Sequence, residues 1–483
     1  MKELQSILFG VALREVVGST KQLVNDIQMD SRKATPASVF VAISGVQVDG
    51  HHFIDTAIEK GATVIVCEEL PGVKISGVTY LMVENTSVAV AIMAHQFYNE
   101  PSNKIKLVGI TGTNGKTTVA TLLFKLFKGL GYTCGLISTV ENHIADTIVP
   151  ATHTTPDAIQ LNALLDKMVQ AGCTHVFMEV SSHAIHQHRV TGLNFTGGVF
   201  TNITHDHLDY HKNLKNYLQA KLYLFSSLLK KNSFAILDTD IPEFSIISKI
   251  CKKRKIKILS FGSKGNAIKL ISHYYFGKKQ IIKINFLNKI YNIKLDLIGD
   301  FQIKNLFAAI LASYLSVKNP DQIINVLSKI RSATGRMQYV GNKKKSAVVV
   351  DYAHTPDALK KSLQTLAKQF NKKVDVVFGC GGDRDKGKRY KMGKIANQFA
   401  SKIYLTNDNP RSENPTSIIN QIKTGCLRGK IILDRKIAIK TAINNLNTES
   451  NLLIAGKGHE NYQIINNQKK YFSDQKVSKL FLK

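Results

Sequence analysis

The chain has 483 residues, and at roughly 150 residues per domain this length predicts about three domains rather than a peptide or a single module. Hydrophobic residues make up 44% of the chain and charged residues 21%, which is typical of a globular protein and excludes disorder over most of its length. The 65 lysine and arginine residues outnumber the 35 aspartate and glutamate residues, so the net charge is +30.

This positive charge has two interpretations. It is compatible with nucleic-acid binding, but lysine together with abundant isoleucine and asparagine is also what an AT-rich coding bias produces. The lysines are spread along the chain, and no aromatic and basic platform or recognition-helix pattern accompanies them. We therefore expect no nucleic-acid partner, although a nucleotide-gated nucleic-acid-binding protein remains an alternative class.

Two further features concern the compartment. No apolar run approaches the roughly 18 residues that a membrane span requires, and residues 1–20 lack an apolar core with a cleavage site. The six cysteines include no CxxC pair, which argues against a disulfide framework or a zinc ribbon. We expect a cytoplasmic protein with buried, reduced thiols and no membrane span.

Short β-branched runs alternate with amphipathic stretches along the chain, which predicts an α/β protein with parallel sheets flanked by helices. A first block, residues 1–100, contains predicted strands at 38–43 and 63–67. A helix is predicted between them at 52–60, and another follows at 87–99.

A second block, residues 101–332, opens with a predicted strand at 104–110, a glycine-rich loop and a helix that ends near Gly129. Strands follow at 175–181 and 197–203. Three runs at 255–261, 281–287 and 292–298 predict an antiparallel excursion, and a helix is predicted over 301–317.

A third block, residues 333–483, shows predicted strands at 346–352, 373–382, 402–408 and 451–458. Each is followed by a polar or glycine-bearing turn. Because ligands bind at the carboxyl ends of strands in such sheets, these turns are candidate binding loops.

The loop from Gly112 to Thr118, GTNGKTT, stands between a predicted strand and a predicted helix, as a phosphate-binding loop does. In that interpretation Lys116 neutralises the β- and γ-phosphate oxygens and the Thr117 hydroxyl holds Mg²⁺. The alternative is a strand-to-helix turn that merely needs glycines.

Candidate metal ligands follow two predicted strands. Glu179 ends an apolar strand, where a carboxylate can bridge a metal and a phosphate or simply cap the next element. The segment Thr204–His211 is rich in histidine and aspartate. Its spacing matches none of the usual zinc signatures, and an oxygen-rich Mg²⁺ site is equally compatible.

The run that begins at Thr111 first shows a resemblance to the Mur ligases, the ATP-dependent amino-acid-adding enzymes of peptidoglycan precursor synthesis. The motifs are TGTNGKTT, the DHLD segment at 206–209, DNPR at 408–411 and AGKGHE at 455–460. The resemblance runs from about Asp30 to Gln463. It implies a small N-terminal uridine-binding α/β domain, a central ATPase-type domain with a phosphate loop and a mainly parallel sheet, and a C-terminal Rossmann-like α/β domain.

The resemblance also implies residue roles. The catalytic groups would be Lys116, Glu179, His207 and Lys221, with Lys221 carbamylated, and the Mg²⁺ ligands would be Thr117, Glu179, His207 and the Lys221 carbamate. ATP would be bound by Gly112, Thr113, Asn114, Gly115, Lys116, Thr117, Thr118, Asn305 and Arg336. Without the resemblance, Lys221 would pass as an ordinary surface lysine.

For the acceptor, the resemblance implies binding of UDP-N-acetylmuramoyl-L-alanyl-D-glutamate by residues of the first two blocks. They are Met29, Ser31, Val46, Gln47, Val48, His153, Thr154, Thr155, Ser181, Gln187 and Arg189. Read without the resemblance, the hydroxyls of Thr154 and Thr155 before a proline-started helix are explained equally well as a helix cap.

For the incoming amino acid, the resemblance implies meso-2,6-diaminopimelate, bound by Arg384, Asp408, Asn409, Pro410, Arg411, Gly456 and Glu460. Diaminopimelate differs from lysine by a distal carboxylate, and the planar guanidinium of Arg411 can bind that group with two hydrogen bonds. Glu460 could accept from the distal ammonium.

The implied reaction is ATP-dependent amide formation through an acyl phosphate, which releases ADP and phosphate. Mg²⁺ is the expected cofactor, and we expect the enzyme to be a monomer. Two other ligases remain open: one resembling folylpolyglutamate synthetase, and a lysine-adding Mur ligase. The uridine-type first block argues against the folate enzyme.

Overall fold

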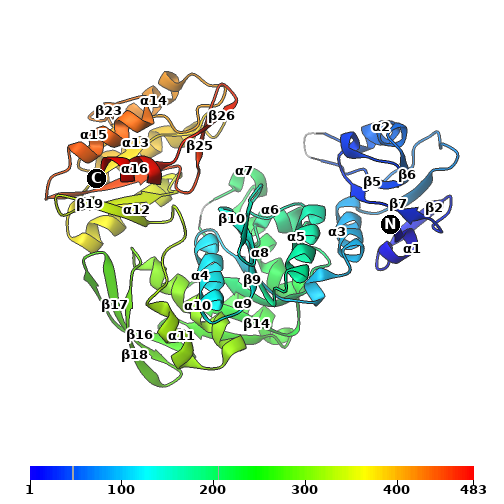
Figure 1. The fold of residues 1–483 in the computed structure, drawn as a ribbon, viewed down its shortest axis with the longest axis horizontal. Coiled ribbons are helices and arrows are strands. Elements are labelled where there is room, and N and C mark those ends of the chain that lie inside the picture. Colours follow the sequence, from blue (N-terminus) through cyan, green and yellow to red (C-terminus); the bar gives the residue numbers. More distant parts are fainter. Residues whose placement is uncertain (46–47, 205, 483) are drawn as a thin grey trace. The chain divides into compact units, whose positions relative to one another are not determined.

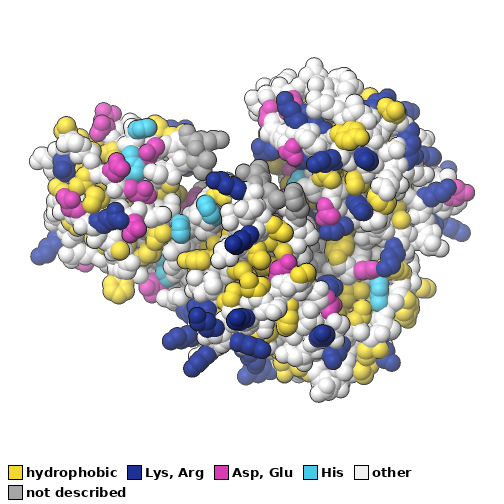
Figure 2. Space-filling model, turned by 180° about the vertical axis from the view of Figure 1, so that it is seen from behind, with side chains coloured by type: hydrophobic (Ala, Val, Ile, Leu, Met, Phe, Trp, Pro, Cys, Tyr) yellow, Lys and Arg dark blue, Asp and Glu magenta, His cyan; other side chains and the backbone are white. Residues whose placement is uncertain are grey.

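The computed structural model describes residues 1–45, 48–204 and 206–482, and it divides into two compact units, residues 1–260 and 261–483. Within the described residues, no helix is both long enough and apolar enough to cross a membrane. Lysine and arginine side chains occur over much of the face seen in Figure 2, and several gather at its lower left.

The first sheet of unit 1 has the strand order β2-β7-β6-β5-β4 (Figure 1). Its strands are Leu13–Val17 (β2), Ile27–Gln28 (β4), Ser38–Val41 (β5), Ala62–Cys67 (β6) and Thr79–Val83 (β7). β4 to β7 are parallel, and only β2 is antiparallel, to β7. Apolar side chains form a core on each face of this sheet, and α2 (Ile54–Glu59) and α3 (Thr86–Phe97) contribute to them.

The second sheet of unit 1 carries the phosphate loop. From β9 its strands run in the order β9-β12-β8-β13-β14-β15. They are Cys134–Ile137 (β9), His175–Glu179 (β12), Lys106–Thr111 (β8), Phe195–Phe200 (β13), Leu229–Asp238 (β14) and Lys257–Phe261 (β15). β9, β12, β8, β13 and β14 are all parallel, so their carboxyl ends meet at one edge. The antiparallel strands β10 (Glu141–Ile144) and β11 (Thr147–Pro150) extend the sheet beyond β9.

The main helices of this region are α4 (Lys116–Gly129), α5 (Ala158–Gln170), α6 (Ser182–His186), α8 (Leu214–Tyr223) and α9 (Phe244–Lys253). The apolar residues of α4, such as Leu122 and Leu126, are fully buried, as a helix packed on a parallel sheet requires.

Unit 2 begins with the strands β16 (Ile268–Phe276), β17 (Lys279–Phe286) and β18 (Lys289–Leu295), which pair antiparallel in sequence order. The antiparallel excursion predicted for 255–298 is therefore correct for its later strands and wrong for its first. The strand at 257–261 meets β16 in parallel, through Phe261 and Ile268, and the strand at 268–276 was not predicted. Most β16 side chains are exposed although many are apolar, and a register shift between Leu270 and Ser272 breaks the alternation of apolar and polar residues that marks a strand.

Two helices, α10 (Phe301–Val317) and α11 (Pro320–Leu327), follow β18. A six-stranded sheet then has the order β19-β20-β24-β21-β22-β23, parallel except for β19. Its strands are Gln338–Lys343 (β19), Ser346–Asp351 (β20), Lys373–Phe378 (β21), Ile403–Leu405 (β22), Lys430–Ile431 (β23) and Ser450–Ala455 (β24).

The helices of this sheet are α12 (Pro356–Phe370), α13 (Gly387–Phe399), α14 (Pro415–Lys423), α15 (Arg435–Asn444) and α16 (Asp474–Phe481). A hairpin of β25 (Tyr462–Ile465) and β26 (Gln468–Tyr471) follows β24. Two apolar cores line the two faces of the sheet, so its binding loops extend from the carboxyl edge.

Candidate active site

The phosphate loop runs between β8 and α4 and is tied to the carboxyl end of β13. The Thr113 amide donates to the Asn202 carbonyl at 2.8 Å, and the Asn114 amide donates to the Asn202 side-chain oxygen at 3.0 Å. Gly112 has a φ of +144°, and a Cβ there would lie 1.9 Å from Oγ1 of Thr201. The loop therefore requires glycine at this position.

Two lysines converge on this loop. Lys116 Nζ donates to the carbonyls of Gly112 and Thr113 at 2.9 and 3.0 Å, and Lys221 Nζ donates to the same Gly112 carbonyl at 2.9 Å. Lys221 comes from α8 and is 1% exposed, with its ammonium 4.4 Å from the centre of the Tyr217 ring. Burial, reinforced by the nearby Lys116 ammonium, holds the pKa of Lys221 well below its usual value.

This placement bears on the predicted carbamylation. Carbamate formation needs a neutral amine, and a buried lysine with a lowered pKa supplies one. The prediction that Lys221 would look like an ordinary surface lysine without the resemblance is wrong for the structure, because the side chain is buried beneath the phosphate loop.

Glu179 lies at the carboxyl end of β12, beside β8, with which it is in register at Ile110. It is 1% exposed, and its Oε1 accepts a hydrogen bond from the Thr139 amide at 2.7 Å. Its backbone carbonyl accepts from the Thr155 hydroxyl at 2.8 Å. Glu179 thus connects the phosphate-loop edge to the loop that precedes α5.

The oxygen donors at this edge are of the kind that Mg²⁺ binds. The Thr117 hydroxyl and the Glu179 carboxylate are both on buried residues, and Thr111 Oγ1 is a buried oxygen for which the described residues offer no hydrogen-bond partner. Within the described ranges, this edge included, no three histidine, cysteine, aspartate or glutamate side chains are grouped so that they could hold a metal ion. The chemistry of the donors fits magnesium bound partly by protein and partly by phosphate.

His207 lies at the start of α7 (Leu208–His211), with φ +53° and an imidazole 3.6 Å from an Asp206 oxygen. Its ring centre is 4.8 Å from that of His183 and 6.1 Å from that of Tyr217. Because Tyr217 also contacts Thr113 and Lys221, His207 lies on the same side of the loop as the buried lysine.

A second hydrogen-bonded group joins four of the residues predicted to bind the acceptor. Arg189 donates to the Thr155 carbonyl at 2.9 Å and to the Gln187 side-chain oxygen at 3.0 and 2.5 Å. The Ser181 amide donates to the Thr155 hydroxyl at 3.2 Å. These residues come from α6, the turn after it and the loop before α5.

Thr154 is linked to this group through Thr139. The Thr139 hydroxyl donates to that of Thr154 at 3.0 Å, while the Thr139 amide binds Glu179. His153 is exposed. Thr139 therefore hydrogen-bonds both a residue of the predicted acceptor site and the carboxylate of Glu179, the predicted metal ligand.

The predicted uridine-binding residues lie in the first sheet and its loops. Ser31 is buried in a short 3₁₀ turn, where Asp30 caps the Arg32 amide, and Met29 packs against the adjacent apolar core. Val48 is exposed. Val46 and Gln47 lie outside the described residues.

Two of the residues predicted to bind ATP belong to unit 2. Asn305 is buried in α10 and donates to the Gln302 side chain at 3.2 Å. The Arg336 guanidinium lies 4.6 Å from the centre of the Tyr352 ring. Burial and nearby Glu460 raise the pKa of Tyr352 to about 12, so this ring stays neutral.

The DNPR segment follows β22. Arg411 has a left-handed backbone, φ +55°, and its Nη1 donates to the carbonyls of Gly382 and Asn409 at 2.7 and 3.4 Å. Asn409 is buried, and its amide group donates to Glu460 Oε2 at 2.9 Å. Arg384 is exposed and donates to the Asp383 carbonyl at 3.2 Å.

Asp408 and Gly456 pack closely together, because a Cβ at residue 456 would lie 2.5 Å from an Asp408 carboxylate oxygen. Pro410, the residue between Asn409 and Arg411, is also buried. The loops after β22 and β24 therefore form one cluster that holds a guanidinium and a carboxylate on its two sides.

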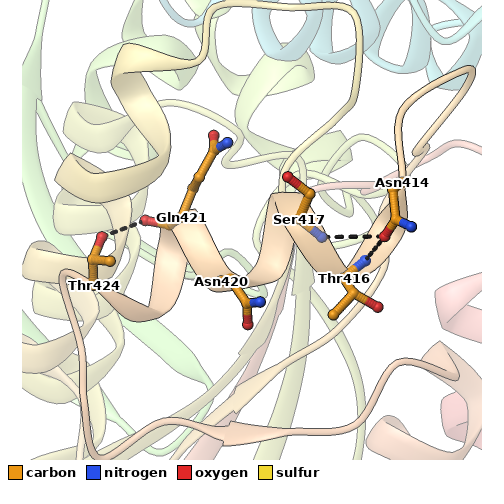
Figure 3. A pocket seen from close by; sticks show the side chains of 6 residues that line it. All are labelled: Asn414, Thr416, Ser417, Asn420, Gln421 and Thr424. Carbon is orange, nitrogen blue, oxygen red and sulfur yellow. Dashed lines mark hydrogen bonds between the residues drawn. The ribbon is translucent and has the colours of Figure 1, made fainter.

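A pocket elsewhere in unit 2 is lined by six neutral polar residues of α14 and its cap (Figure 3). Asn414 accepts hydrogen bonds from the amides of Thr416 and Ser417, which makes it the helix cap. None of the predicted site residues lines this pocket, and it carries no charged side chain for an anionic substrate.

Four residues of the site were missed by sequence reasoning. They are Thr139, Asn202, Tyr217 and Lys457. Asn202 and Lys457 lie near the carboxyl ends of predicted strands, a signal that could have identified them. Thr139 and Tyr217 are recognisable only from the contacts of their side chains.

Three family models match the chain in order: "Mur ligase family, catalytic domain" over residues 24–113, "Mur ligase middle domain" over 110–313 and "Mur ligase, glutamate ligase domain" over 335–458. The UDP-N-acetylmuramoyl-L-alanyl-D-glutamate--2,6-diaminopimelate ligase of Cytophaga hutchinsonii is 44% identical to it, over 99% of both chains.

Two solved structures are also similar. One, described as a UDP-N-acetylmuramoyl-L-alanyl-D-glutamate--2,6-diaminopimelate ligase, has a TM-score of 0.71 and 30% identity, covering 100% of this chain and 98% of its own. A Mycobacterium tuberculosis folylpolyglutamate synthase has a TM-score of 0.64 with 16% identity, over 77% of this chain and 93% of its own. At that identity the second likeness concerns the fold alone.

Proposed function

This chain belongs to the Mur ligase family, and from that membership we propose that it joins 2,6-diaminopimelate to UDP-N-acetylmuramoyl-L-alanyl-D-glutamate, converting ATP to ADP and phosphate. The reaction belongs to peptidoglycan precursor synthesis. The D-glutamate side-chain carboxylate attacks the γ-phosphorus of ATP, which forms an acyl phosphate and releases ADP. The amine of meso-diaminopimelate then attacks the acyl carbon, loses a proton, and phosphate leaves.

We assign the three steps of this reaction to three domains. Residues 1–100 bind the acceptor, residues 101–332 bind ATP and carry the chemistry, and residues 333–483 bind the amino acid. The phosphate loop supports the second assignment. Its amides and the N-terminus of α4 suit an anion, and the Lys116 ammonium already lies over the loop. Gly112 to Thr118 hold the triphosphate, and Asn305 and Arg336 complete the nucleotide site.

Thr117, Glu179, His207 and Lys221 as its carbamate would hold Mg²⁺, which neutralises charge on the transferred phosphoryl group. The buried, low-pKa amine supports this role for Lys221, because carbamylation replaces a cation with an oxygen ligand. Unmodified, its ammonium could only repel a metal ion.

The acceptor is assigned to the Arg189 group and to the loops of the first sheet. The hydrogen bonds that lock Arg189 against Gln187 and Thr155 support the assignment, because a guanidinium held in one orientation is suited to a carboxylate or a phosphate. Met29, Ser31, Val46, Gln47 and Val48 would contact uridine, and His153, Thr154 and Ser181 would contact the rest of the acceptor.

One observation carries the choice of amino acid. Arg411 and Glu460 are joined through Asn409, so a cation and an anion stand on neighbouring loops. The distal end of diaminopimelate bears a carboxylate and an ammonium, which need these two partners. Lysine lacks the distal carboxylate, so in a lysine complex the Arg411 guanidinium would have no carboxylate to bind. Arg384, Asp408, Pro410 and Gly456 shape the same site.

The experiment that tests the function is an amino-acid competition assay with the UDP-muramoyl dipeptide and MgATP. We expect incorporation of meso-diaminopimelate from an equimolar mixture with L-lysine and D-glutamate. Equal use of lysine would overturn the assignment of the amino acid. Products with tetrahydrofolate and glutamate, and none with the muramoyl dipeptide, would overturn the reaction itself.

Replacing Arg411 tests whether this residue binds the distal carboxylate of diaminopimelate. We expect Arg411→Ala to raise the KM for diaminopimelate by about 10-fold to 100-fold, since a charged hydrogen bond contributes about 1.5–3 kcal/mol. The KM for ATP should stay within about twofold. Arg428→Ala, which removes another guanidinium that binds backbone carbonyls of the same unit, is the control. Equal effects on both substrates would contradict the role.

A further inference from the structure

Lys457 is a buried cation between two loops of the proposed amino-acid site. It follows β24 in the AGKGHE segment, and none of its side chain is exposed. Its Nζ donates to Asn409 Oδ1 and to Glu460 Oε2, both at 2.9 Å, and lies 4.0 Å from an Asp408 oxygen. Because a buried ammonium is costly without partners, these contacts are what allow a lysine here.

The two partners of Lys457 are also bonded to each other, which closes a triangle. Asn409 Nδ2 donates to the same Oε2 of Glu460 at 2.9 Å, and Asn409 Oδ1 also accepts from the Ile464 amide at 3.0 Å. Among the hydrogen bonds of the described residues, both that reach the Glu460 carboxylate end on Oε2. Its other oxygen, Oε1, accepts neither of these two hydrogen bonds.

The backbone under Lys457 is itself supported by a buried ion pair. Arg435 Nη2 donates to the carbonyl of Ala455 at 2.9 Å, and the same guanidinium binds Asp474 through Nε at 2.8 Å and through Nη2 at 2.7 Å. Both side chains of this pair are fully buried. The end of β24 is thus held in place, and the ammonium of Lys457 has a defined position.

We propose that Lys457 is a positioning residue for the incoming amino acid, acting through Asn409 and Glu460. It fixes Glu460 by one oxygen, so that the other accepts from the distal ammonium of a diamino dicarboxylic acid. It also separates the carboxylates of Asp408 and Glu460, which would otherwise face each other without a cation. This inference rests on the proposed function.

The test replaces Lys457 by methionine, an unbranched side chain one heavy atom shorter that lacks the charge and the donors, and by glutamine, which keeps one donor group. We expect Lys457→Met to raise the KM for meso-diaminopimelate by about tenfold or more, with Lys457→Gln intermediate. The KM values for ATP and for the UDP-muramoyl dipeptide should change by less than about twofold.

Asn451→Ala is the matched control. Asn451 is fully buried at the opposite end of β24 and accepts from the Ala347 amide at 2.8 Å, so the variant loses a buried hydrogen bond of the same strand away from the loops. We expect Asn451→Ala to lower the unfolding temperature without changing the KM for diaminopimelate.

A double-mutant cycle separates positioning from bulk stability. In a Glu460→Gln background, Lys457→Met should raise the KM for meso-diaminopimelate by less than half as much, on a logarithmic scale, as it does in the wild type. Full additivity would overturn the proposal, as would an unchanged KM or loss of the fold in both Lys457 variants while Asn451→Ala folds. If the wild-type protein were itself inactive with diaminopimelate, that result would instead contradict the proposed function.

Discussion

At the scale of single residues, burial gives Lys221 a reactivity that its residue type alone does not. Its amine lies under the phosphate loop, beside the Lys116 ammonium, and both effects favour the neutral form. A neutral amine adds CO₂, and the resulting carbamate carries the negative charge that a magnesium site needs. The same burial raises the pKa of the Cys134 and Cys251 thiols to about 12, where the neutral form is unreactive.

We expect Lys221→Ala to lower kcat by about 100-fold or more, because the proposed metal support is lost, and added bicarbonate should not restore activity. Lys215→Ala, at an exposed position of the same helix, is the control. With ¹³C-bicarbonate, wild-type protein should show a carbamate resonance that the Lys221 variant lacks. Because the amine must be neutral, this resonance should weaken as the pH falls through the lowered pKa of Lys221. Near-normal activity of Lys221→Ala would refute the carbamate.

At the scale of elements, the turn from β8 into α4 depends on the absence of a side chain at residue 112. The +144° φ of Gly112 and its contact with Thr201 leave no room for a Cβ. Gly131, just beyond the other end of α4, has φ +87°, but a Cβ there would meet nothing within 4 Å. Substitution of Gly131 would therefore introduce backbone strain alone, whereas substitution of Gly112 would add a steric clash to it.

We expect Gly112→Ala to weaken ATP binding at least about tenfold, since strain of about 1–3 kcal/mol would displace the loop amides. Gly131→Ala should destabilise the protein slightly and leave the affinity for ATP unchanged. Isothermal titration with a non-hydrolysable ATP analogue measures both. Similar affinities in the two variants would show that the loop tolerates a Cβ.

The buried pair Arg435–Asp474 joins α15 to α16, and its loss should destabilise unit 2. We expect Asp474→Ala to lower the free energy of unfolding by about 3–5 kcal/mol, because it leaves a buried guanidinium uncompensated. Lys361→Ala, which breaks the exposed pair with Asp357 on α12, should change it by less than about 0.5 kcal/mol. Urea unfolding followed by circular dichroism distinguishes the two, and equal losses would contradict this ranking.

At the scale of the whole molecule, each unit contains an apolar cluster made of its own residues, so binding at one site need not stabilise the two units equally. In the proposed function, nucleotide binds the native phosphate loop and not the unfolded chain. We expect MgADP at 100 times its Kd to stabilise the unit that carries the loop by about 2.7 kcal/mol. Calorimetry should show this as a raised Tm that Lys116→Met abolishes. The same shift in that variant would exclude the loop as the nucleotide site.

Much of the fold was predictable because its signals are local. The apolar strand at 106–111, the glycine loop and the helix at 116–129 follow from neighbouring residues, as does the helix at 301–317. The strand at 268–276 escaped prediction because its apolar residues do not alternate regularly with polar ones, and a register shift lies between Leu270 and Ser272. The direction of the strand at 257–261 also escaped it, because pairing is decided by the partner strand and not by the segment itself.

The sequence by itself determined the family, the order of the motifs and the residue types available for phosphate, carboxylate and ammonium. Only the tertiary structure decided which of these residues meet. Lys221 reaches the Gly112 carbonyl across 109 positions of the chain, and Lys457 reaches Asn409 across 48. The physical reason is burial: the low pKa of Lys221 and the closed triangle of Lys457 exist only where folding removes water from groups that are distant in the chain.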